Sequence, residues 1–66
     1  MKKAEYMKKH GLSLRPVQPE DLFFADTDDK RRSEYIISDG ENEWFSVHGS
    51  MKDLMDFVKY NRRYSA

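Results

Sequence analysis

Two short runs of β-branched and aromatic residues, separated by a polar turn, stand out in the middle of the chain. The runs are Glu34–Ser38 and Glu43–His48, within the stretch YIISDGENEWFSV. Asp39-Gly40 between them is a strong hairpin signal, because glycine adopts the positive φ that a tight turn requires. The pattern predicts an antiparallel hairpin.

The pattern leaves the register of this hairpin open. If the numbers of facing residues sum to an odd value, as in a two-residue Asp39-Gly40 turn, one face holds Tyr35, Ile37 and Trp44 and the other holds Ile36, Phe45 and Val47. If they sum to an even value, one face holds Tyr35, Ile37, Phe45 and Val47, and Ile36 lies with Trp44, because a one-residue slip turns over every side chain of one strand. Both registers put large apolar groups on both faces. Helices can cover one face, and the other must be covered by something else or left open to solvent.

The last quarter of the chain repeats its apolar residues with the period of an α-helix. One stripe holds Met51, Leu54, Met55 and Val58, and a second stripe beside it holds Phe57, Tyr60 and Tyr64. Ser50 can cap this helix, and Asp53 three residues later can complete a capping box. The spacing predicts a helix from Ser50 to about Tyr64 that packs Leu54, Met55 and Val58 against the hairpin.

A second helix is predicted at the other end of the chain, from Lys2 to His10. The segment is rich in helix formers, and lysines stand in its last turn, where the helix dipole favours positive charge. Gly11 can take the left-handed position after this helix, and Leu12 can then fold back onto Tyr6 or Met7.

The segment between this helix and the hairpin has a less regular pattern. LSLRPVQP, residues 12–19, contains two prolines and is predicted to be an extended connector. Pro19 and the two acids after it are compatible with a single helical turn, an alternative that the pattern leaves open. Leu22–Ala25 is then predicted as a short strand, and ADTDDKRRS, residues 25–33, as a polar loop.

The predicted order of elements is α-β-β-β-α, which makes one small α+β domain over residues 1–66: a three-stranded antiparallel meander packed against N- and C-terminal helices. A chain of this length buries only about 60% of the surface that its unfolded form exposes. It has no cysteine for a disulfide, and its two histidines, His10 and His48, are too few for a zinc site. We therefore expect no metal and no cofactor.

Charge and hydropathy limit the binding partners and the cellular compartments that we expect for this protein. Twelve basic and 12 acidic residues give a formal net charge of zero, so no global field draws the protein to nucleic acid or to an anionic membrane. No apolar run is long enough to span a membrane, and the N-terminus lacks the apolar stretch of a signal peptide. The absence of cysteine fits a reducing compartment, so we expect a cytoplasmic protein.

No pattern in the sequence supports catalysis. The aspartates of ADTDDK could suggest a calcium loop, but an EF-hand needs glycine at its sixth position and glutamate at its twelfth, where this chain has Arg31 and Ile37. His48 precedes a helix start, yet the chain offers it no cysteine nucleophile and no acid at a spacing that would orient it. We expect no catalytic residues, and we interpret the aspartates as a solvated turn.

Trp44 is the strongest candidate for contact with a partner. Tryptophan is over-represented at interface hot spots, and the acids around the hairpin turn would attract a basic partner. Against this, a chain of 66 residues can need its only tryptophan for the core. The hypothesis is a surface that binds another protein, or a second copy in a homodimer, through Trp44, Tyr35, Ile37, Glu41 and Glu43.

A nucleic-acid interface is the alternative hypothesis. The C-terminal segment KYNRRYSA interleaves basic and aromatic residues, as do surfaces that track a phosphate backbone and stack on bases. The same charges also suit the end of a helix. The candidate residues are Lys59, Tyr60, Arg62, Arg63 and Tyr64.

The charge comes in bands: residues 1–15 carry a balance of +4, and residues 16–29 carry five acids and no base. In size, lack of cysteine and this banded charge, the chain resembles the small accessory proteins that bacteria and their phages encode, some of which inhibit larger enzymes by occupying a binding groove. This resemblance is one of kind and covers no motif. It implies a non-enzymatic, protein-binding role.

Overall fold

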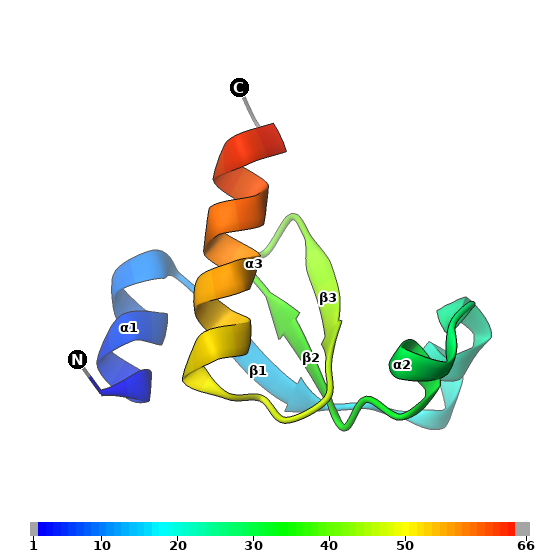
Figure 1. The fold of residues 1–66 in the computed structure, drawn as a ribbon. Coiled ribbons are helices and arrows are strands. Elements are labelled where there is room, and N and C mark those ends of the chain that lie inside the picture. The colour runs from blue at the N-terminus through cyan, green and yellow to red at the C-terminus, as the bar shows by residue number, and fades with distance from the viewer. Residues whose placement is uncertain (1, 65–66) are drawn as a thin grey trace.

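Three short antiparallel strands lie between a helix at each end of the described chain (Figure 1). This computed structural model describes residues 2–64, with side chains as far as Asn61. The elements are α1 (Lys3–His10), β1 (Ser13–Pro16), the 3-10 helix η1 (Pro19–Phe24), α2 (Asp28–Arg31), β2 (Tyr35–Ser38), β3 (Glu43–Ser46) and α3 (Met51–Tyr64). The strands form one sheet in the order β1-β2-β3, so the predicted α+β meander with flanking helices is confirmed.

The first strand lies earlier in the chain than the sequence pattern predicts. β1 pairs with β2 through Leu14 opposite Ile37 and Pro16 opposite Tyr35. Proline is tolerated here because β1 is an edge strand and Pro16 stands at its end. The predicted strand at Leu22–Ala25 is wrong, and the supposed connector LSLRPVQP supplies the strand instead.

The segment after β1 forms the helical turn that the sequence left open. Pro19 suits the first helical position because its fixed φ matches the helix. The Asp21 carboxylate accepts from the backbone N–H of Gln18 at 2.7 Å, and the Asp21 N–H donates to the Gln18 carbonyl at 3.0 Å. This closed turn continues as η1 to Phe24, and it overrides the strand preference of the apolar residues that follow Asp21.

β2 and β3 form the predicted hairpin, and the structure decides its register. Ile36 faces Phe45 and Ile37 faces Trp44, so the numbers of facing residues sum to an odd value. Tyr35, Ile37 and Trp44 consequently share one face of the sheet, and Ile36 and Phe45 share the other.

The hairpin loop has four residues, 39–42, which are the residues between the two predicted strands, and it is longer than the two-residue Asp39-Gly40 turn considered for the odd register. The Asp39 carboxylate accepts from the backbone N–H groups of Glu41 at 2.9 Å and Asn42 at 2.7 Å. These bonds widen the turn beyond Asp39-Gly40, because aspartate in a turn satisfies the backbone two and three residues on. Gly40 nevertheless has the expected positive φ, 96°.

The core lies between α3 and the face of the sheet that holds Ile37. Ile37, Leu54 and Phe57 are fully buried. Partly buried apolar groups surround them: Tyr6, Met7, Leu12, Leu14, Trp44 and Val58. Leu54 and Val58 pack inward as predicted, but Met55 is 50% exposed and the prediction for it is wrong. Phe57 takes its place in the core, where the ring of Trp44 packs edge-on against it.

Both main helices are capped as the sequence indicates. Gly11 has φ of 65°, and the Leu12 N–H donates to the Met7 carbonyl at 2.8 Å, which is the fold-back expected after α1. At the start of α3, the Asp53 N–H donates to the Ser50 hydroxyl at 3.3 Å. These local caps fix where each helix begins or ends.

The other face of the sheet is partly covered by the long connection between β1 and β2. η1 and α2 lie across the sheet from α3 (Figure 1). Arg15 reaches from the sheet to η1, where both of its terminal nitrogens donate to Asp21, at 2.8 and 3.0 Å. Ile36 on this face and Ala25 after η1 are buried. The predicted polar loop therefore contains one short helix, α2, and belongs to a small lobe that shields Ile36.

Candidate functional site

Two backbone hydrogen bonds show which residues of β2 bond to β1 and which bond to β3. The Val17 N–H donates to the Glu34 carbonyl at 2.9 Å, and the Asp39 N–H donates to the Asn42 carbonyl at 3.2 Å. Hydrogen-bonded pairs alternate along an antiparallel ladder. It follows that within Tyr35–Ser38 the even-numbered residues bond to β1 and the odd-numbered residues bond to β3. Just before β2 the ladder departs from this rule, because the Glu34 N–H donates to the Ser46 carbonyl at 3.1 Å.

β3 therefore has an outer edge with known backbone groups. In the register observed, Trp44 and Ser46 face the odd-numbered residues of β2 and bond to them. The backbone N–H and C=O groups of Glu43 and Phe45 consequently point away from the sheet. Among the described residues, no strand pairs with this side of β3.

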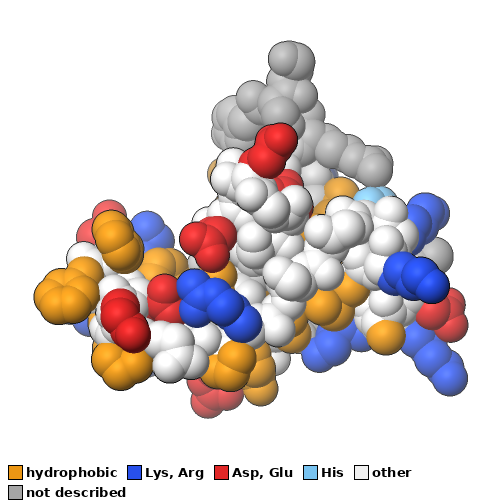
Figure 2. All heavy atoms as spheres, turned by 180° about the vertical axis from the view of Figure 1, so that it is seen from behind, with side chains coloured by type: hydrophobic (Ala, Val, Ile, Leu, Met, Phe, Trp, Pro, Cys, Tyr) orange, Lys and Arg blue, Asp and Glu red, His pale blue; other side chains and the backbone are white. Residues whose placement is uncertain are grey.

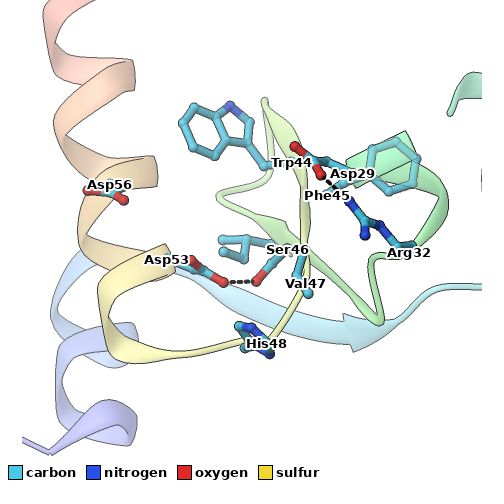
Figure 3. A pocket seen from close by; sticks show the side chains of 10 residues that line it. Asp29, Arg32, Trp44, Phe45, Ser46, Val47, His48, Asp53 and Asp56 are labelled. Atoms are coloured by element: carbon cyan, nitrogen blue, oxygen red, sulfur yellow. Dashed lines mark hydrogen bonds and ion pairs between the residues drawn. The ribbon is translucent and has the colours of Figure 1, made fainter. Parts of the chain in front are cut away.

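A groove of about 510 Å³ follows this edge (Figure 3). Its lining includes the unbroken run of residues 44–48, together with Asp29 and Arg32 near α2 and Asp53 and Asp56 on α3. Successive side chains of a strand point to opposite faces, so a run of this kind can line one groove only along the strand edge. The groove thus separates α2 from α3 and has the outer side of β3 between them.

Aromatic side chains from three elements gather around β3. The ring of Trp44 lies edge-on to Phe57 and to Tyr60, with centroid distances of 5.5 and 5.3 Å. On the other side of the strand, Phe24 lines a second hollow with Trp44 and Phe45. Phe24 is 75% exposed and Tyr60 is 50% exposed. We call Phe24, Trp44, Phe45 and Tyr60 the β3 aromatic surface.

The apolar surface continues along η1. Phe23 is 90% exposed and Leu22 is 46% exposed, and both stood in the predicted short strand. Figure 2 shows hydrophobic side chains gathered on the outside of the lobe that η1 and α2 form. The sequence analysis did not predict this surface. The pattern that could have indicated it is Pro19 followed by two acids, because this pattern favours a helical turn in place of a strand.

Acidic groups border the groove on its α3 side. The Asp53 carboxylate accepts from the Ser46 hydroxyl at 2.6 Å. This bond is the main reason why the pKa of Asp53 is lowered, and the backbone N–H groups of His48 and Ser50 act in the same direction against desolvation. Asp56, one turn later, is half exposed and pairs with Lys52 at 3.3 Å. The lowered pKa keeps the Asp53 carboxylate charged at neutral pH.

Ser46, His48 and Asp53 share the groove but do not have the arrangement of a nucleophilic triad. In such a triad the imidazole lies between the hydroxyl and the acid. Here the Ser46 hydroxyl donates directly to Asp53, and it accepts from the Gly49 N–H at 2.8 Å (Figure 3). Ser46 is also buried. Its hydroxyl therefore holds the turn before α3.

The structure separates the residues that the sequence suggested for partner binding. Ile37 is fully buried beneath α3, and Tyr35 is half-buried with its ring against Gly49, so neither belongs to an open sheet face. Trp44 is half-buried at the sheet edge and lines the hollows on both sides of β3. Its neighbours Glu41 and Glu43 are exposed. Helices α1 and α3 thus cover the face that holds Trp44, and the open surface is the edge of β3.

The alternative residues lie at the C-terminal end of α3. Lys59 and Tyr60 are exposed and line a hollow with Trp44 and Asp56. The side chains of Arg62, Arg63 and Tyr64 lie outside the described residues. The described part of this surface therefore combines one base with one acid beside the aromatic rings.

The aspartates in and beside α2 form ion pairs with nearby basic side chains. Each one pairs with a single cation, in the pairs Asp26–Lys30, Asp28–Arg31 and Asp29–Arg32. Among the described residues, no group of three or more acids, histidines or cysteines could hold a metal ion. Within the same residues, no helix has the length and apolar character needed to cross a membrane.

Comparisons with family models, curated proteins and solved structures find no match to this chain. The surface described above combines an open strand edge, exposed aromatic rings and a border of carboxylates.

Proposed function

We propose that this protein is a small non-enzymatic protein-binding module that uses the β3 aromatic surface. The observation that carries the proposal is the exposure of Phe24 and Tyr60 on either side of the half-buried Trp44. Large apolar groups exposed side by side mark interaction sites, and aromatic residues are enriched at the centres of interfaces. Tryptophan and tyrosine also dominate binding hot spots.

The surface is held in place before any partner binds. η1 carries Phe24 and is fastened to the sheet by the paired hydrogen bonds from Arg15 to Asp21. Trp44 and Tyr60 hold each other through their edge-on ring contact. Groups that are already ordered lose less conformational freedom on association, so such a surface binds more tightly than a loose one of equal area.

The border of the surface indicates the charge of the partner. Glu43, Asp53 and Asp56 lie along β3 and the facing side of α3. Acids at the border of an interface attract a basic partner and repel an acidic one. We place the protein in the cytoplasm as an accessory or inhibitor-like protein, since its cysteine-free chain suits a reducing compartment.

Capture from cell extract tests this proposal with a matched pair of variants. Phe24→Ser removes an exposed ring from the β3 aromatic surface, and Met55→Ser removes a comparable exposed group from the outer side of α3. Both should keep the wild-type circular dichroism spectrum and melting temperature. We expect one protein to be retained by wild type and by Met55→Ser after nuclease treatment, and to be lost with Phe24→Ser.

Two results would contradict the proposal. Equal capture by both variants would show that the contact lies elsewhere. Loss of every captured protein after nuclease treatment would favour the nucleic-acid alternative, for which the exposed Tyr60 beside Lys59 is the supporting observation.

A further inference from the structure

We infer that the outer edge of β3 takes up an extended basic segment of a partner protein as a fourth strand of the sheet. This inference rests on the protein-binding function proposed above and names the chemistry of the partner. Strand addition of this kind draws its affinity from main-chain hydrogen bonds and its specificity from alternate side chains.

The two edges of the sheet are not equally able to accept a strand. On β1 the outward backbone groups are those of Leu14 and Pro16, because the residues between them bond to β2. Pro16 has no N–H, so the β1 edge presents a single donor. On β3, Glu43 and Phe45 each present a donor and an acceptor, and the strand contains neither proline nor lysine, the residues that usually block an edge.

The space beside β3 suits a strand. The groove of about 510 Å³ lies along the edge, with α2 on one side and α3 on the other (Figure 3). A bound segment would run between the two helices, and its backbone would meet the outward groups of Glu43 and Phe45.

An added strand would need different kinds of side chain on the two faces of the sheet. Residues opposite Trp44 and Ser46 would point toward α3, where Asp53 and Asp56 lie. Residues beside Phe45 would point to the other face, where Phe24 and Phe45 line a shared hollow with one base, Lys30, and one acid, Glu43. Successive side chains alternate between faces. The segment that fits therefore alternates basic and apolar residues.

The same charges argue against a second copy of the chain as the occupant. If two β3 strands paired about a two-fold axis, each copy would bring its own Asp53 and Asp56 to the new pairing. Like charges placed together across an interface cost free energy, whereas lysine or arginine on the added strand would pair with these acids. Charge complementarity thus favours a basic segment.

Backbone NMR with synthetic peptides tests this inference. The probe is an eight-residue peptide of alternating lysine and valine, added to the ¹⁵N-labelled full chain. One control peptide has glutamate in place of lysine. A second control keeps the sequence but carries N-methyl groups on alternate residues, which removes the donors along one edge. We expect the Lys/Val peptide alone to bind and to slow amide exchange at Phe45.

Paired charge variants test the role of the acids. Asp56→Asn removes a carboxylate that lines the groove, and Asp28→Asn removes an exposed carboxylate of α2 that does not. We expect Asp56→Asn to weaken peptide binding by about two- to five-fold, the range of an exposed ion pair, and Asp28→Asn to leave it unchanged.

Several outcomes would overturn the inference. Binding without slowed exchange at Phe45, or equal binding of the N-methylated peptide, would show that no strand is added. Equal binding of the glutamate peptide, or concentration-dependent dimers joined at β3, would remove the basic segment as occupant. Failure of the Lys/Val peptide to bind would also overturn it. If extract capture still depended on Phe24 in these cases, the proposed function would stand and only strand addition would fail.

Discussion

Leu54 fills the centre of the core, and its neighbour Met55 provides a matched comparison. Leu54 is fully buried between α3 and the sheet, while Met55 is 50% exposed. We expect Leu54→Ala to lower the free energy of unfolding by about 2–5 kcal/mol, because it leaves a cavity in a small core. Met55→Ala should lower it by about 0.5 kcal/mol or less. Urea denaturation measures both, and similar losses for the two variants would show that α3 presents a different side to the sheet.

Trp44 illustrates what a residue pattern can and cannot decide. Strand alternation places Trp44 and Ile37 on one face in the odd register, and the structure confirms that placement. The pattern does not say that Ile37 is fully buried while Trp44, on the edge strand, is reached from both sides. Exposure depends on strand order and on where α3 crosses the sheet, and these are tertiary features. Trp44 consequently contributes to the core, where it packs against Phe57, and also to the open surface, where it lines the hollows on both sides of β3.

At the scale of elements, η1 is fastened to the sheet by one carboxylate. Asp21 accepts two hydrogen bonds from Arg15 and one from the Gln18 N–H. We expect Asp21→Asn to loosen η1 without unfolding the protein, because the core under α3 does not include it. Amide hydrogen exchange should become faster at Ala25, whose N–H closes the end of η1.

Acid should release η1 in the same way. The hydrogen bond from Arg15 is the main reason why the pKa of Asp21 is lowered to about 2. An unfolded aspartate has a pKa of about 3.9, so this group stabilises the docked η1 fully above about pH 4. That contribution is lost as the pH falls through about 2. The amide shift of Ala25 should follow this midpoint in wild type and should not in Asp21→Asn.

Glu20→Gln is the control for both measurements, since it removes the adjacent acid outside the bonded group. Exchange at Leu54 in α3 should be unchanged in either variant. A midpoint near pH 4 in wild type, or equal effects of Glu20→Gln and Asp21→Asn, would show that the ion pair does not hold η1.

Elements whose ends depend on neighbouring residues are the ones that sequence predicts well. Gly11 ends α1, Ser50 caps α3 and Gly40 permits the hairpin loop, and each needs only a few adjacent positions. β1 is different, because it is defined by its pairing with a distant strand while two prolines locally argue against it. The lobe of η1 and α2 was not predicted for a related reason: an apolar run suggests burial, and only the tertiary structure shows that Phe23 is 90% exposed.

At the scale of the whole molecule, charge is balanced and mostly local. The formal net charge is zero, so no long-range field acts on a partner. Part of the banded charge cancels in close pairs in and beside α2, namely Asp26–Lys30, Asp28–Arg31 and Asp29–Arg32. Glu41 and Glu43 at the end of the hairpin stay exposed next to the β3 aromatic surface. Any steering must therefore come from acids close to the surface, of which Glu41 and Glu43 are two.

Two charge reversals that change the net charge equally can separate local steering from a global effect. In Glu41→Lys the changed residue lies beside β3, and in Glu5→Lys it lies on α1, away from the groove. We expect Glu41→Lys to slow association with the Lys/Val peptide several-fold at about 0.01 M salt, where screening reaches about 30 Å, and to have little effect at about 1 M, where it reaches about 3 Å. Glu5→Lys should have little effect at either concentration. Stopped-flow fluorescence of Trp44 measures these rates. Equal slowing of association by both variants would mean that the net charge of the protein sets the rate. A loss of rate with Glu41→Lys that does not depend on salt would mean that Glu41 contacts the peptide directly. Either result would contradict local steering.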